Sequence, residues 1–89
     1  MKTRKQLYEA ALGRPLAATD RALGFLYATE GEQQAAHYAL IMSGAQYLLY
    51  DGWHKQAVVL VGSKEGEQAV RAVMTGVEFE PSMSIAREI

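Results

Sequence analysis

Apolar residues near the start of the chain recur with the spacing of one helical face. Thr3 and Gln6 match a capping box, in which the threonine hydroxyl accepts from the N3 amide and the glutamine bonds back to the cap. Gly13 comes directly after the last apolar residue and suits a left-handed C-terminal position. The apolar stripe consists of Leu7, Tyr8, Ala11 and Leu12. The pattern predicts a helix over residues 4–12.

A second group of apolar residues follows, with two candidate starting points. Pro15 has no backbone donor and therefore suits the first turn of a helix, whereas Thr19 and Asp20 offer a start four residues later. Gly24 either weakens this helix or admits a close neighbour. The apolar positions are Ala22, Leu23, Phe25, Leu26 and Tyr27. We expect a second helix that carries these residues.

The clearest helix start in the chain is Thr29 with Glu32 three residues later, a second capping box with acidic residues at the positive end of the helix dipole. Helical spacing then continues through Tyr50 despite Gly44, over Ala35, Tyr38, Ile41, Met42, Ala45, Leu48 and Leu49. We therefore expect one long third helix, with this stripe facing the core, closed by Asp51-Gly52.

An alternative for the same region is a β-hairpin. Asp51-Gly52 is also a strong two-residue turn, with residues 46–50 and 55–61 as its flanking strands. Neither flank alternates apolar with polar residues as a half-buried antiparallel strand does, and this favours the helix.

The second half of the chain predicts a strand, a helix and a strand. Residues 57–61 form a β-branched run typical of a strand buried on both faces, and Ser63 suits the cap of a helix ended by Gly76. Residues 77–80 alternate as a short half-exposed strand before Pro81. A compact crossover would make the two strands parallel neighbours that need a further strand or a second subunit. The last residues, 82–89, suit a helical turn or a loose tail.

The predicted fold is therefore a predominantly helical α+β domain over residues 1–89, with three N-terminal helices followed by a strand–helix–strand unit. The chain contains no cysteine, which excludes disulfides and cysteine-ligated metal sites and fits a reducing compartment. No apolar run approaches the roughly 20 residues that a membrane span requires. We expect a cytoplasmic protein that does not enter the membrane.

Charge argues against nucleic acid as the main partner. The net charge is −1 and the pI is about 6.1, although residues 1–21 hold five Lys or Arg residues and two acidic residues. A winged-helix module remains an alternative, with the hairpin as its wing. Its recognition helix would open with Glu30 and Glu32 and contain no Lys or Arg through Tyr50, so phosphate would be attracted poorly.

The sequence holds no motif that specifies a reaction, a cofactor or a metal. His37 and His54 lack the neighbours of a catalytic or zinc site, and the carboxylate pairs Glu65/Glu67 and Glu78/Glu80 suit solubilising charge. Gly62, Ser63 and Lys64 join the predicted strand to a helix N-terminus, where free amides can hold an anion. The spacing is not that of a P-loop, and a plain helix cap at Ser63 explains it.

Aromatic residues near the end of the third predicted helix either border the core or form an interface, because a helix that is apolar on two faces is central in the core or shared with a partner. Leu40, Gly44 and Tyr47 form a second apolar line on that helix, and Tyr50 and Trp53 follow closely. Tyrosine and tryptophan dominate interface energetics once desolvated. We therefore expect a non-enzymatic protein that binds another protein, and itself as a homo-oligomer, with Leu40, Tyr47, Tyr50 and Trp53 as anchors. A small regulator or inhibitor, as phages and mobile elements often encode, is the concrete form of this hypothesis; a small-molecule or anion binder at the Gly62 turn is the remaining alternative.

Overall fold

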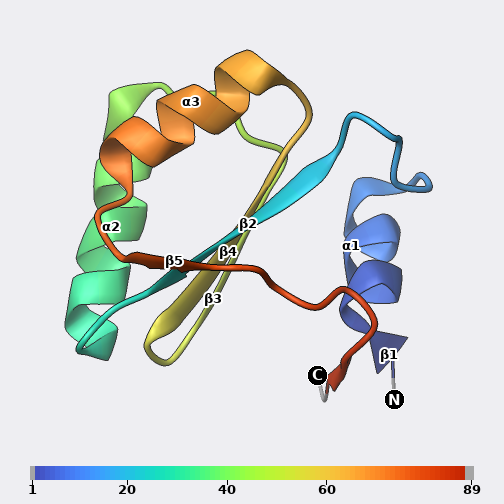
Figure 1. The fold of residues 1–89 in the computed structure, drawn as a ribbon, viewed down its shortest axis with the longest axis horizontal. Coiled ribbons are helices and arrows are strands. Elements are labelled where there is room, and N and C mark those ends of the chain that lie inside the picture. The colour runs from blue at the N-terminus through green and yellow to red at the C-terminus, as the bar shows by residue number, and fades with distance from the viewer. Residues whose placement is uncertain (1, 88–89) are drawn as a thin grey trace.

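The computed structural model describes residues 2–87, in which three helices and six strands form (Figure 1). The helices are α1 (Arg4–Leu12), α2 (Glu30–Ser43) and α3 (Lys64–Val73). The strands are β1 (Lys2–Thr3), β2 (Arg21–Leu26), β3 (Leu49–Trp53), β4 (Gln56–Val61), β5 (Val77–Phe79) and β6 (Ala86–Arg87).

Four of the strands form one antiparallel sheet in the order β3-β4-β2-β5. Along the chain this sheet and two helices read β2-α2-β3-β4-α3-β5, which is the split βαβ arrangement of ferredoxin-like domains. β4 and β5 run in the same direction, because both pair antiparallel with β2. The predicted parallel pairing of these two strands is wrong, because β2 lies between them.

The helices cover the sheet from two sides (Figure 1). α2 and α3 pack on one face around Phe25, Leu40, Val59 and Val70, whereas α1 packs on the other face around Tyr8, Val58 and Leu60. β4 therefore contributes alternate residues to two apolar clusters, which explains its unbroken apolar run. The prediction of a strand buried on both faces over residues 57–61 is confirmed.

The two ends of the described chain meet in a second, small sheet. β1 pairs antiparallel with β6, with Lys2 opposite Arg87 and Thr3 opposite Ala86. Neither a helical turn nor a loose tail describes residues 86–87, which form a strand; residues 88–89 lie outside the described part. The pairing holds the start of α1 beside the segment that follows β5 (Figure 1).

The prediction of three N-terminal helices is wrong, because residues 21–26 form the central strand β2. Leu23, Phe25 and Tyr27 enter the cluster under α2 and α3, while Ala22 faces the α1 side. Both faces of this strand are apolar, so its sequence lacks the alternation that marks a half-buried strand. Gly24 does admit a close neighbour, since a Cβ atom there would lie 2.6 Å from the carbonyl oxygen of Phe79.

The prediction of one long helix over residues 30–50 is also wrong. α2 ends at Ser43, whose hydroxyl donates to the Leu40 carbonyl at 2.7 Å, and Gly44 takes the left-handed conformation with φ of 73°. The hairpin alternative correctly expects two paired strands, but it places the first strand at residues 46–50 instead of 49–53 and misplaces the turn. β3 continues through Asp51 and Gly52, and the chain reverses at His54, whose φ is 53°.

The predicted helix starts at Thr3, Thr29 and Ser63 are confirmed, whereas the start expected at Pro15 or Thr19-Asp20 is wrong, because β2 follows there. Thr3 and Gln6 form the reciprocal capping box of α1, which spans residues 4–12 and ends at a left-handed Gly13. The hydroxyl of Thr29 accepts from the Glu32 amide at 3.1 Å, and that of Ser63 from the Gly66 amide at 3.0 Å. These local signals depend on neighbours within one helical turn, and tertiary packing does not override them.

Candidate functional site

The structure separates the four residues that the sequence predicts as interface anchors. Leu40 lies in the core with 0% of its surface exposed, so it has no side chain to offer a partner. Tyr47 and Tyr50 are partly buried against the cluster under α2 and α3. Trp53, at the end of β3, is 57% exposed. Of the four, Trp53 is the residue with more than half of its surface exposed.

Tyr50 joins α2 to the β3–β4 hairpin. Its ring stacks on His37 with centroids 3.7 Å apart and planes 2° from parallel. Its hydroxyl donates to Oε1 of Gln33 at 2.6 Å, and Nε2 of Gln33 donates to the His54 carbonyl at 3.2 Å. Burial raises the pKa of Tyr50 above its usual value, with smaller contributions from Tyr27, Tyr47 and Asp51. The phenol therefore remains protonated, and its hydrogen bond to Gln33 links β3 to α2.

Trp53 belongs to a row of side chains that crosses the sheet. The register places Trp53 opposite Gln56, Gln56 opposite Leu26, and Leu26 opposite Val77. Residues that face one another across an antiparallel sheet project from the same face. We call Trp53, Gln56, Leu26 and Val77 the open row.

The open row lies on the face that α1 covers, but beyond the reach of α1. Side chains of α1 pack with Leu49, Leu60 and Ala22, and Phe79 joins the same cluster one row nearer the open row. The open row comes next, about 7 Å further along the strands. Leu26 is 44% exposed and Val77 is 73% exposed. The sheet therefore presents three large apolar side chains in register at one end.

Polar and charged residues border the open row. A hollow of about 380 Å³ is lined by Leu26, Glu30, Trp53, His54, Lys55 and Gln56. His54 Nδ1 lies 3.8 Å from Glu30 Oε2, and the ring of His54 tilts against that of Trp53 with centroids 4.5 Å apart. An apolar centre with a rim of both charges is the anatomy of a protein-binding surface.

The anion-site candidates lie at the opposite end of the sheet. Ser63 caps α3 through its hydroxyl, and Lys64 is exposed. A Cβ atom on Gly62 would lie 3.4 Å from Oδ1 of Asp20, and the first turn of α3 carries Glu65 and Glu67. Gly62 and Ser63 line a hollow of about 470 Å³ together with Tyr47, which the sequence placed in a separate site. Arg14 pairs with Asp20, and Arg21 and Arg71 pair with Glu67, so charges of both signs lie at this end of the sheet.

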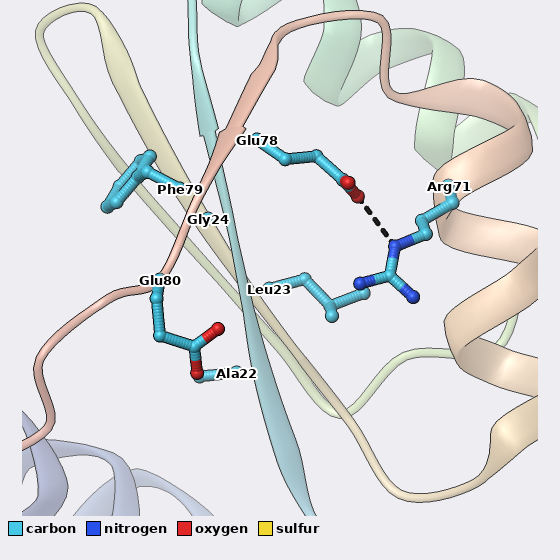
Figure 2. Close-up of a pocket in the computed structure, with 7 residues that line it drawn as sticks. All are labelled: Ala22, Leu23, Gly24, Arg71, Glu78, Phe79 and Glu80. Atoms are coloured by element: carbon cyan, nitrogen blue, oxygen red, sulfur yellow. Dashed lines mark hydrogen bonds and ion pairs between the residues drawn. The ribbon is translucent and has the colours of Figure 1, made fainter.

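A third hollow, of about 230 Å³, lies where β5 leaves β2, and Figure 2 shows Arg71 reaching toward Glu78 across it. The Arg71 Nε atom donates to Glu78 at 2.6 Å, and Glu67 pairs with both Arg71 at 2.7 Å and Arg21 at 2.9 Å. The expectation that Glu67 only solubilises the surface is wrong, because it is buried in this network. These ion pairs link α3 to β2 through Arg21 and to β5 through Glu78.

Comparison of the chain with protein families, curated proteins and solved structures finds no match. Within residues 2–87, no group of three or more His, Asp or Glu side chains is arranged to hold a metal ion. In the same residues, none of the helices has the length and apolarity needed to cross a bilayer. The candidate site is therefore defined by the geometry of the open row and its rim.

The sequence pattern missed both Leu26 and Val77. Leu26 was assigned to a helix and Val77 to a strand with no partner on β2, so nothing placed them beside Trp53. These residues lie beside Trp53 because of the register between strands far apart in sequence, and a single sequence does not show that register.

Proposed function

We propose that this protein acts by binding another protein through the open row, as a small regulator or inhibitor in the cytoplasm, without catalysing a reaction itself. The observation that carries the proposal is the alignment of Trp53, Leu26 and Val77 across the strands with 57%, 44% and 73% of their surfaces exposed. Single exposed apolar residues are ordinary on protein surfaces, whereas a contiguous group with a polar rim marks an interaction site.

Trp53 is the expected centre of binding energy. Its neighbours Leu26 and Gln56 would exclude water around it, and Glu30 and Lys55 would meet opposite charges at the rim. Truncation of such an aromatic anchor costs about 2 kcal/mol or more, which weakens binding by roughly thirtyfold or more. Val77 is the most exposed of the three and should contribute less than Trp53, because its side chain has a smaller apolar surface to bury.

The partner can be trapped by photo-crosslinking in the cells that make the protein. A photoreactive residue at position 77 should yield an adduct of defined mass, whereas the same residue at Glu65, exposed on α3, should not. The purified partner should then bind the Trp53→Ala variant at least about thirtyfold more weakly than the wild type in calorimetry. Equal affinity for wild type and variant, or equal adducts from positions 65 and 77, would contradict the proposal.

The fold does not match a winged-helix module. The winged-helix alternative depends on three consecutive N-terminal helices, and residues 21–26 form β2 instead of the second helix. The open row contains no Lys or Arg, and Lys55 at its rim is offset by Glu30, so it offers little attraction to phosphate.

A further inference from the structure

α2 carries a second exposed apolar surface, on the side of the helix that faces away from the sheet. Tyr38 is 66% exposed, Ile41 54% and Met42 68%. Each residue advances about 100° around a helix, so Tyr38 lies about 160° from the buried Leu40. The stripe that the sequence pattern assigned to the core is thus on the outside. We call Tyr38, Ile41 and Met42 the α2 stripe.

We propose that the α2 stripe is the surface through which two copies of this protein associate, with the two helices antiparallel about a two-fold axis. This inference does not rest on the proposed function, because α2 and the open row lie on opposite faces of the sheet. A second copy can occupy the stripe while a different protein occupies the open row.

Charge favours a second copy as the occupant. The chain has no Asp, Glu, Lys or Arg between Glu32 and Asp51, so none of these charged residues lies on α2 from residue 33 to its end. A two-fold interface brings the same surface from both copies together, so a charged residue near its centre would lie close to the same charge on the second copy and repel it. The absence of charge over these residues removes that repulsion and also removes any preference for a charged partner.

The residues that flank the stripe permit close approach of two helices. Ala35 and Ala39 are exposed beside Tyr38 and add almost no bulk. Ala35, Tyr38 and Met42 follow one another at steps of three and four residues, which is the spacing of a helix–helix seam. Tyr38 and Met42 of one copy can therefore pack into the small-residue gaps of the other.

The acidic start of α2 sets the direction of pairing. Glu30 and Glu32 lie in the first turn, and the last turn carries no basic residue. A parallel pair would place four carboxylates side by side. An antiparallel pair whose two-fold axis passes through the stripe near residue 40 keeps these carboxylates apart. Glu32 lies about 12 Å along the helix from that axis in each copy, so the two acidic first turns are at least about 24 Å apart.

The interface should be small, because one helix of four turns supplies most of it. Interfaces at the lower end of the size range give weak and reversible complexes. We therefore expect a monomer–dimer equilibrium that shifts with concentration between about 1 µM and 1 mM.

Sedimentation equilibrium on the full chain tests the proposal. Ile41→Glu and Ile41→Lys should each be monomeric at concentrations where the wild type is dimeric, since like charges would meet near the two-fold axis. An equimolar mixture of the two variants should dimerise again, because opposite charges then face each other. Val77→Glu, which places a charge on the open row, is the matched control and should dimerise as the wild type does.

Disulfide trapping gives a second measurement that does not depend on affinity. The chain has no cysteine, so Tyr38→Cys introduces the only thiol, and mild oxidation should link two copies covalently. Val77→Cys should remain unlinked under the same conditions. A wild type that stays monomeric to about 1 mM, or an Ile41→Glu variant that dimerises normally, would overturn the proposal and leave the stripe to a different protein.

Discussion

The hydroxyl of Tyr8 on α1 donates a 2.7 Å hydrogen bond to Oδ2 of Asp51 on β3, across 43 positions of sequence. Tyr8 is the buried residue of its helix, and its ring packs against Val58 and Leu60. The contact fixes α1 over the middle of the sheet. It therefore also fixes where α1 stops covering the sheet, and so how much of the open row remains exposed.

Tyr8→Phe should lower the free energy of unfolding by about 1.5–3 kcal/mol, the range for a hydrogen bond to a charged group. The variant retains the buried ring and loses only the hydroxyl. Tyr38→Phe makes the same chemical change at an exposed position and should leave stability nearly unaltered. Urea denaturation at low protein concentration measures both, and equal losses in the two variants would show that the Asp51 bond contributes nothing.

Gly24 allows β5 to lie against β2. A Cβ atom at this position would lie 2.6 Å from the Phe79 carbonyl oxygen and 2.9 Å from two carbons of its ring. Gly24→Ala should therefore disrupt the β2–β5 pairing and cost about 1–3 kcal/mol, as overpacking does. Hydrogen exchange should show faster exchange in β5 than in β3.

Gly31→Ala is the control for that substitution. Gly31 lies in the first turn of α2, where the side-chain atom nearest to an added Cβ would be Oγ1 of Thr29, 3.9 Å away. Alanine is the better helix former, so the variant should gain up to about 1 kcal/mol. A Gly24→Ala protein as stable as Gly31→Ala would contradict the close packing of Phe79 on β2.

Leu40 and Ile41 are neighbours on α2 with opposite environments. Leu40 is fully buried and Ile41 is 54% exposed. Leu40→Ala should cost about 2–5 kcal/mol, as removal of a buried leucine does. Ile41→Ala should stay within about 0.5 kcal/mol when measured on the monomer. Thermal or urea unfolding distinguishes this orientation of α2 from the reverse, in which Ile41 would be the costly position.

That orientation explains why the sequence predicted the start of α2 correctly but the wrong face of this helix toward the sheet. Thr29 marks its start through a local bond to the Glu32 amide, and such a cap can be recognised within one turn. Its apolar residues occupy both sides, with Ala36 and Leu40 buried and Tyr38 and Met42 exposed. When a helix has two apolar stripes, its sequence does not show which stripe packs against the sheet.

β2 and β3 were missed for a different reason. β2 is buried by packing on both faces, so its polar positions are too few to show a period of two. β3 follows α2 after a loop of five residues, and helical spacing happens to continue through Leu48 and Leu49. The left-handed Gly44 was the local signal that ended the helix, and it was outweighed by the apolar pattern.

The loop between α1 and β2 gives a prediction about pH. Arg14 donates to Asp20 from Nη1 at 2.6 Å and from Nη2 at 3.3 Å, and the Ala17 amide donates to the same carboxylate at 2.7 Å. The hydrogen bond from Arg14, with that from Ala17, holds the pKa of Asp20 below its usual value of 3.8. The folded state therefore binds a proton at this group less readily than the unfolded state does.

A carboxylate with a lowered pKa stabilises the fold above its unfolded pKa and loses that contribution as the pH falls through its folded value. Asp20→Asn should thus be less stable than the wild type at neutral pH, and the gap should narrow below about pH 3.8. Arg14→Gln provides the partner for a double-mutant cycle, whose coupling with Asp20→Asn should be favourable at neutral pH and vanish in acid. A coupling that stays constant between neutral pH and acid would mean that the Arg14 contact does not act through the charge of Asp20.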